Sequence, residues 1–141
     1  MFSFFLQPIL LLPILASLFL AILFLQSGLD KVFAWQGNLS WLEGHFSKTF
    51  LRTQVKMMLG VITFTEVAAG VLCALGVFEI LFFKTAILSL LGGELASLTL
   101  VMLFFGQRIA QDYVGAAGLV PYFVMSLISN IMFALLTNYT F

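Results

Sequence analysis

Four long apolar runs limit the fold of this chain more than any other feature of its sequence. They cover about residues 8–33, 55–78, 85–106 and 114–136. A helix of about 20 residues spans the roughly 30 Å hydrocarbon core of a bilayer, so each run predicts a transmembrane helix. We therefore expect an all-α fold, an integral membrane four-helix bundle that forms a single domain over residues 1–141.

The composition agrees with a membrane location. The chain is 62% hydrophobic and 9% charged, with a mean hydropathy of +1.16, whereas soluble domains carry about 25% charged residues. The formal net charge is zero, which excludes the basic surface of a nucleic-acid-binding protein. The lipid bilayer is thus the first expected partner, and nucleic acid is not one.

The connection between the first and second runs predicts a short interfacial helix over about residues 40–52. Ser40 and Glu43 have the S-x-x-E spacing of a capping box, which would start the helix at Ser40. Leu42, Phe46 and Phe50 recur at helical spacing and would lie in the membrane interface. Alternatively, this segment covers one end of the bundle.

Two acidic residues interrupt the apolar runs and are the first candidates for a ligand or proton site. Glu66 lies near the middle of the second run and Glu94 lies in the third. A central charge costs about 2.5–3.5 kcal/mol on insertion scales, so Glu66 should be protonated, paired or facing a cavity. Measured from a turn expected at Glu79–Lys84, both carboxyls should lie at similar depth, where they could share a proton.

Other polar residues supply further candidates. Lys31 and Asn130 are possible ligand or proton sites, and Lys31 could also snorkel to the interface. Arg108 and Asp112 are four residues apart and would pair on a continuous helix. The candidates for interface ion pairs are Asp30, Lys31, Arg108 and Asp112.

Small residues predict close helix packing. Glu66 shares a helical face with Gly70 and Cys73, and Gly92 and Gly93 begin small-xxx-small patterns. The glycines expected at helix contacts are Gly60, Gly70, Gly92, Gly93, Gly115 and Gly118.

The ionisable and nucleophilic residues argue against an enzyme acting on its own. Cys73 is the only cysteine, so the chain by itself forms no dithiol centre and no internal disulfide. One histidine and one cysteine are too few for a zinc or iron–sulfur site, so no metal is expected. His45 is expected at the surface of the interfacial segment. We find no nucleophile–base set or phosphate-binding loop in the sequence.

Two stretches resemble the DoxX-like family of small four-helix membrane proteins. They are Ser27-Gly28-Leu29-Asp30-Lys31-Val32 and the run from Glu66 to Gly76. The matching positions are Gly28, Lys31, Glu66, Gly70 and Gly76. This family includes the small subunit of thiosulfate:quinone oxidoreductase and the MauE proteins. The resemblance implies a membrane component of a redox or oxidative-stress system, with a quinone as the only cofactor suggested and none bound covalently.

Two functions follow as hypotheses. In the first, the chain is a non-catalytic membrane subunit or assembly partner of a redox, quinone-linked or oxidative-stress complex, so other membrane subunits are its partners. In the second, it is a small unit that binds or transports a proton, a quinone or a lipid through Glu66 and Glu94.

Basic residues in the loops predict the orientation of a multi-pass protein in the inner membrane. Connections 1–2 and 3–4 would be cytoplasmic and both termini outside. Lys84 is the only basic residue assigned to the outer side, and the residues assigned to the cytoplasmic side are Lys31, Lys48, Arg52, Lys56 and Arg108.

Overall fold

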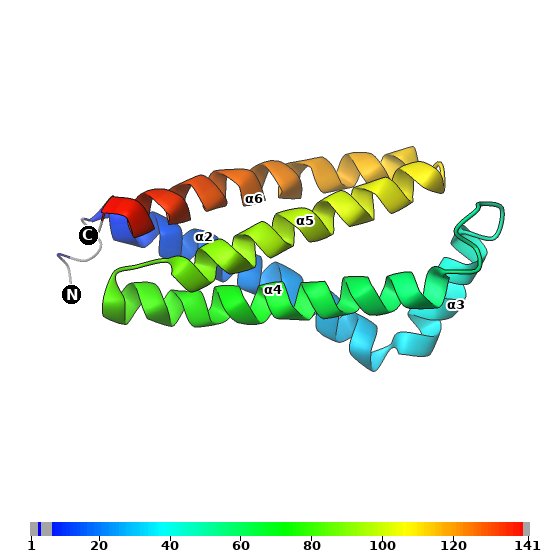
Figure 1. The fold of residues 1–141 in the computed structure, drawn as a ribbon, viewed down its shortest axis with the longest axis horizontal. Coiled ribbons are helices and arrows are strands. Elements are labelled where there is room, and N and C mark those ends of the chain that lie inside the picture. Colours follow the sequence, from blue (N-terminus) through cyan, green and yellow to red (C-terminus); the bar gives the residue numbers. More distant parts are fainter. Residues whose placement is uncertain (1–2, 4–6, 140–141) are drawn as a thin grey trace.

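The described part of the chain is helical throughout, apart from turns. The computed structural model describes residue 3 and residues 7–139, and these residues contain no strand. Five helices follow in order: α2 (Pro8–Phe33), α3 (Trp35–His45), α4 (Val55–Phe83), α5 (Ile87–Ile109) and α6 (Tyr113–Tyr139) (Figure 1). The all-α class is confirmed. Four of these helices, α2, α4, α5 and α6, are long and apolar enough to cross a membrane.

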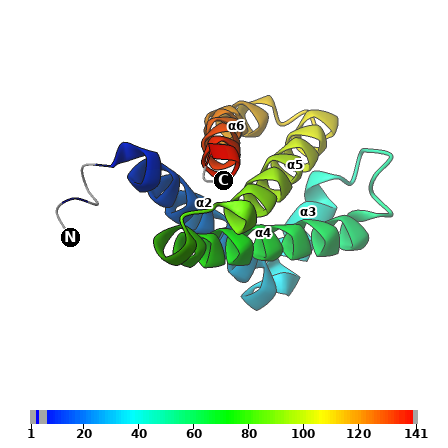
Figure 2. The same cartoon turned by 60° about the vertical axis from the view of Figure 1, so that its left-hand side comes forward.

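The long helices lie roughly side by side, with α3 at one end (Figures 1 and 2). α2 packs on α4, α4 on α5 and α5 on α6, and α2 also contacts α6 and closes the arrangement. α2 and α5 share few contacts and are therefore diagonal neighbours. The main core lies between the four helices, and fully buried Leu20, Phe24 and Phe133 are among its largest side chains.

Helix α2 has the predicted bounds, but the turn between α4 and α5 lies later than expected. α4 continues to Phe83 and stops at Lys84, whose φ of 58° is left-handed and ends the helical repeat. Glu79 is therefore helical. Its carboxylate accepts hydrogen bonds from the backbone N–H groups of Ile87 at 3.2 Å and Leu88 at 2.7 Å. It caps α5 from the preceding helix.

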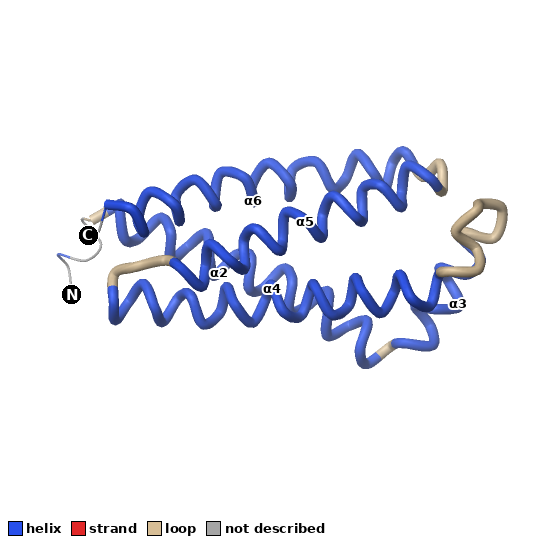
Figure 3. Tube along the Cα trace, viewed as in Figure 1, coloured by secondary structure: helices blue, strands red, loops and turns tan. Residues whose placement is uncertain are grey.

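The short helix between α2 and α4 also differs from its predicted bounds. α3 begins at Trp35 and ends at His45, and turns follow to Gln54 (Figure 3). Ser40 is in the interior of α3, so the expected capping box is wrong. Leu39, Phe46 and Leu51 are buried and form a second small core at this end of the bundle, where the segment packs against α4.

Glycines set the closest helix contacts. A Cβ at Gly76 would lie 2.8 Å from the backbone nitrogen of Ser89, and one at Gly92 would lie 2.8 Å from Sγ of Cys73. These two contacts fix the antiparallel register of α4 and α5. The other glycines that were expected at contacts divide as follows: Gly70 and Gly93 are buried, Gly60 and Gly115 are partly buried, and Gly118 is exposed.

Candidate functional site

The candidate site lies where α2 crosses α4. A Cβ at Gly28 would lie 3.0 Å from the backbone nitrogen of Val67, and a Cβ at Gly70 would lie 2.7 Å from the backbone nitrogen of Leu25. Only glycine allows the two backbones to come this close. The approach at Gly28 places the end of α2 directly beside Glu66.

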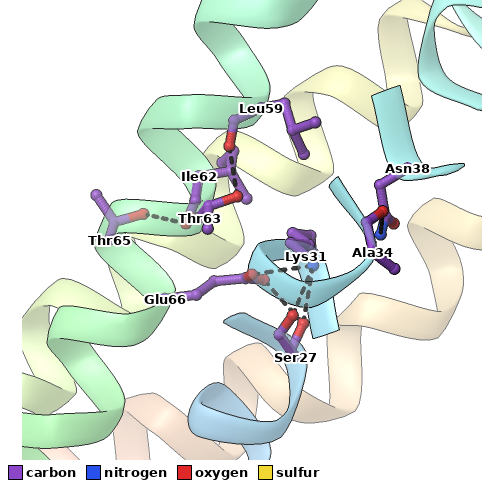
Figure 4. A network of polar contacts seen from close by, with 9 residues as sticks. All are labelled: Ser27, Lys31, Ala34, Asn38, Leu59, Ile62, Thr63, Thr65 and Glu66. Atoms are coloured by element: carbon purple, nitrogen blue, oxygen red, sulfur yellow. Dashed lines mark hydrogen bonds and ion pairs between the residues drawn. The ribbon is translucent and has the colours of Figure 1, made fainter. Parts of the chain in front are cut away.

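Three polar side chains meet at this crossing (Figure 4). Ser27 Oγ donates a hydrogen bond to Glu66 Oε1 at 3.0 Å, and Lys31 Nζ lies 2.9 Å from Glu66 Oε2. Lys31 Nζ also donates to Ser27 Oγ at 3.0 Å. Ser27 and Lys31 are four residues apart on α2 and therefore share one face. Together they form a closed polar triangle, which we call the Lys31–Glu66 cluster.

Burial makes this cluster the main electrostatic feature of the interior. Glu66 is 1% exposed, and the side chain of Lys31 is 18% exposed. Oε1 accepts the hydrogen bond from Ser27, and Oε2 lies within ion-pair distance of the Lys31 ammonium group. Of the three states that the sequence allows for Glu66, the structure shows the paired one.

Glu94 does not join this cluster, contrary to the expected pairing of the two carboxyls. Cys73 packs against Gly92, so Glu66 lies level with about Thr99 on α5. Glu94 is about 7–8 Å further along the axis at 1.5 Å per residue, and its side chain is on the exposed face of α5. The expectation of equal depth was wrong because the turn lies after Phe83 and not at Glu79.

A cavity of about 270 Å³ lies between α3, α4 and α5, next to the cluster. Its wall is mostly apolar, and Lys31 is one of its few polar lining residues. The other polar lining residues are Asn38, His45 and Gln107. Lys31 therefore belongs both to the buried ion pair and to the cavity wall.

His45 lies in this wall and contacts Gln107, Asp112, Trp41 and Phe46, so it is not a free surface residue. Its Nε2 lies 3.1 Å from Oε1 of Gln107 and 3.8 Å from Oδ2 of Asp112. Its ring stacks on Trp41 with the centroids 4.5 Å apart. The spacing of Trp41 and His45, four residues apart on a helix, was the sequence signal for this contact. The contact to Gln107 joins residues that are far apart in sequence, and no local pattern predicts it.

The other charged candidates have different neighbours from those expected. Arg108 does not pair with Asp112, because the helix ends between them, and its guanidinium lies 4.4 Å from the ring centroid of Tyr113. Asp112 instead accepts a hydrogen bond from the backbone N–H of Gly115 at 2.9 Å and caps α6. Asp30 is exposed, without an ion pair among the described residues.

Asn130 lies in a separate polar cluster between α5 and α6. Its Nδ2 donates to Ser97 Oγ at 3.0 Å, and Ser97 Oγ donates to Ser126 Oγ at 2.8 Å. Nothing connects these residues to the Lys31–Glu66 cluster among the interactions of the described residues. Asn130 thus has a local role in joining two helices.

No protein-family model, curated protein or solved structure matches this chain. Any function of the chain must therefore be inferred from the geometry of the Lys31–Glu66 cluster and its cavity.

Proposed function

We propose that this chain is a multi-pass integral membrane protein that binds a small amphipathic molecule, a quinone or a lipid, in the cavity beside the Lys31–Glu66 cluster. The observation that carries the proposal is that Lys31 both lines this cavity and pairs with a buried carboxylate. A ligand in the cavity would touch the end of the only buried ion pair among the described residues.

The lining of the cavity supports this ligand class. Ligand sites are mostly apolar with a few convergent polar groups. Here Leu59, Met58 and Met102 supply apolar surface, while Lys31 and His45 supply nitrogen atoms that can bind a carbonyl, hydroxyl or phosphate oxygen. The volume lies just below the range of about 300–1,000 Å³ typical of ligand pockets. It suits a quinone ring or a lipid head group, with the tail outside the cavity.

Matched tryptophan substitutions on α4 test the proposal. Met58 lines the cavity, whereas the neighbouring Met57 is 63% exposed. We expect the protein purified in mild detergent to retain a specific quinone or lipid that extraction and mass spectrometry identify. Met58→Trp should fill the cavity and lower its occupancy at least about tenfold, while Met57→Trp leaves it unchanged. Equal occupancy in both variants would contradict the proposal.

The second candidate is the non-catalytic subunit or assembly partner of a redox complex that the resemblance to the DoxX-like family implies. The small-residue faces that suggested it are largely used inside the chain's own bundle, since Gly70, Gly76, Gly92 and Gly93 are buried. The test is purification in mild detergent with identification of the proteins that co-purify. Recovery of this chain alone, at native expression, would contradict it.

We also propose the inner membrane and the orientation in which the α3 end is cytoplasmic. The support is the distribution of basic residues, because Lys48, Arg52, Lys56 and Arg108 lie at or near this end and only Lys84 lies at the other. Single cysteines at Lys48 and Lys84, labelled in intact cells by an impermeant maleimide, test it. Labelling at position 48 but not at position 84 would reverse the orientation.

A further inference from the structure

Glu94 is on the outer surface of the bundle, in the middle of an apolar stripe. Six exposed residues of α5 follow each other at alternating intervals of four and three. Apart from Glu94 they are Ile87, Leu91, Leu98, Val101 and Phe105, which are 46–56% exposed. Phe104 and Arg108 are also exposed but are not part of this set. We call this set, with Glu94, the α5 stripe. Its spacing is that of the seam along which two helices pack in a left-handed pair.

This location leaves the carboxyl of Glu94 without a partner. No hydrogen bond or ion pair to Glu94 exists among the described residues. Lys31 is committed to Glu66. At 1.5 Å per residue, Lys84 is about 15 Å away along the axis, and Glu94 is about 10 Å inside the start of α5 at Ile87.

Lipid does not satisfy such a group. The hydrocarbon core offers no hydrogen-bond donor or acceptor, and acidic residues in transmembrane helices almost always face protein or a water-filled cavity. The neighbours Leu91 and Leu98 are apolar and half-exposed, so they provide neither. The missing partner of Glu94 must come from outside the bundle.

We propose that a second copy of this chain covers the α5 stripe, so that the protein is a homodimer. All copies insert in one orientation, so a two-fold axis along the membrane normal brings two α5 helices together at equal depth. A residue near such an axis contacts the same residue of the other subunit. The two Glu94 carboxyls then lie together, and a protonated carboxyl donates a hydrogen bond to the other one.

Two requirements on the partner favour a second copy over a different membrane protein. The partner needs an apolar stripe of matching length and a hydrogen-bonding group at the depth of Glu94, and a second α5 provides both. This interface does not depend on the proposed ligand site, because the cavity is lined by Met102, Leu103 and Gly106 on α5, and none of these belongs to the stripe.

Disulfide cross-linking in native membranes tests the dimer. In a Cys73→Ala background, we compare single cysteines at Leu91 in the stripe and at Ile22 on α2. Ile22 is 62% exposed and on the diagonally opposite helix. Because Leu25 packs on Gly70 and Cys73 packs on Gly92, Ile22 lies at nearly the same depth as Leu91. We expect oxidation to give a dimer of this chain from Leu91→Cys and not from Ile22→Cys.

Substitution of Glu94 then tests its part in the contact. In the Leu91→Cys background, Glu94→Leu should weaken dimerisation about 5- to 30-fold, as expected for the loss of an interhelical hydrogen bond. Glu94→Gln should retain the dimer because amides also pair with each other. Unchanged circular dichroism of each variant would show that the bundle is intact.

Three outcomes would overturn the proposal: equal cross-linking at both positions, no dimer at Leu91→Cys, or a dimer that Glu94→Leu leaves unchanged. A cross-link from Leu91→Cys to a different membrane protein, dependent on Glu94, would assign the stripe to that protein and would also overturn the homodimer.

Discussion

Lys31 Nζ and Glu66 Oε2 are 2.9 Å apart across the contact between α2 and α4. The contact depends on Gly28, where a side chain would collide with Val67, so the glycine and the ion pair belong to one structural unit. Buried pairs gain little net stability over an apolar pair, but removal of one member leaves an uncompensated charge. A substitution of one member of the pair should therefore cost much more stability than a double substitution that removes both charges.

The first prediction is that Glu66→Gln destabilises the protein. The amide retains the shape of the carboxyl and can accept from Ser27, but Lys31 loses its counter-charge. Removing one partner of a buried pair costs about 3–5 kcal/mol. Lys31 is partly exposed, so we expect about 1–3 kcal/mol. Labelling of Cys73 by a fluorescent maleimide during heating measures this loss, because Cys73 is the only cysteine and is 0% exposed in the folded state.

The double variant Lys31→Met, Glu66→Gln serves as the control for this prediction. It removes both charges, so most of the lost stability should return. If Glu66→Gln alone melts like the unsubstituted protein, Glu66 is held as a neutral group and the ion pair is not structural.

The second prediction concerns helix packing. Gly76→Ala would place a Cβ 2.8 Å from the backbone nitrogen of Ser89, which α4 and α5 can accommodate only by moving apart. Overpacking of this kind costs about 1–3 kcal/mol. Gly118→Ala is the matched control, because a Cβ there meets nothing within 4 Å. It should be neutral or stabilise α6 by up to about 1 kcal/mol through helix propensity. Equal melting of the two variants by Cys73 labelling would refute the contact.

The third prediction concerns the cap of α5. Glu79→Ala removes the acceptor of two backbone N–H groups and of the Thr85 hydroxyl. Loss of an N-terminal cap costs about 0.5–2 kcal/mol, and hydrogen exchange at Ile87 and Leu88 should become faster. Glu79→Gln keeps one acceptor and should show a smaller effect. No change in exchange at these two amides in Glu79→Ala would show that water caps this helix.

The fourth prediction separates the two contacts of Asp112. Asp112→Ala removes both the cap of α6 and the carboxylate beside His45, and should cost about 0.5–2 kcal/mol in thermal unfolding. Asp112→Asn keeps a capping oxygen for Gly115, so it should retain most of the stability and lose only the contact of the carboxylate with Nε2 of His45. Equal losses in the two variants would mean that the charge near His45 matters more than the cap.

The sequence was sufficient to predict a helix and its ends where the apolar run is long and its end signals are local. The bounds of α2 follow from its apolar run, with Pro8 in the first turn and Lys31 in the last. The end of α4 was misplaced because Glu79 is a charged residue near the end of an apolar run, which is typical of a turn. Its actual partners, the first amides of α5, become visible only once the connection folds back.

The site was predictable in its members but not in its pairing. Glu66 and Lys31 were both candidates, but the partner expected for Glu66 was Glu94, and no partner was assigned to Lys31. The partner of Glu66 depends on which helix packs beside it and in which axial register. The close contacts at Gly28 and Gly70 determine both. A glycine in a helix indicates that another backbone segment packs closely against it, but the local sequence does not identify that segment.

The shared position of Lys31 has a thermodynamic consequence. Its ammonium group bonds to Ser27 and Glu66 on one side and borders the cavity on the other. A molecule that competes for this ammonium group changes the force that holds α2 against α4, and by reciprocity any change in that contact alters the affinity for the molecule. If the cavity binds the proposed ligand, its occupancy and the α2–α4 contact would therefore be thermodynamically coupled.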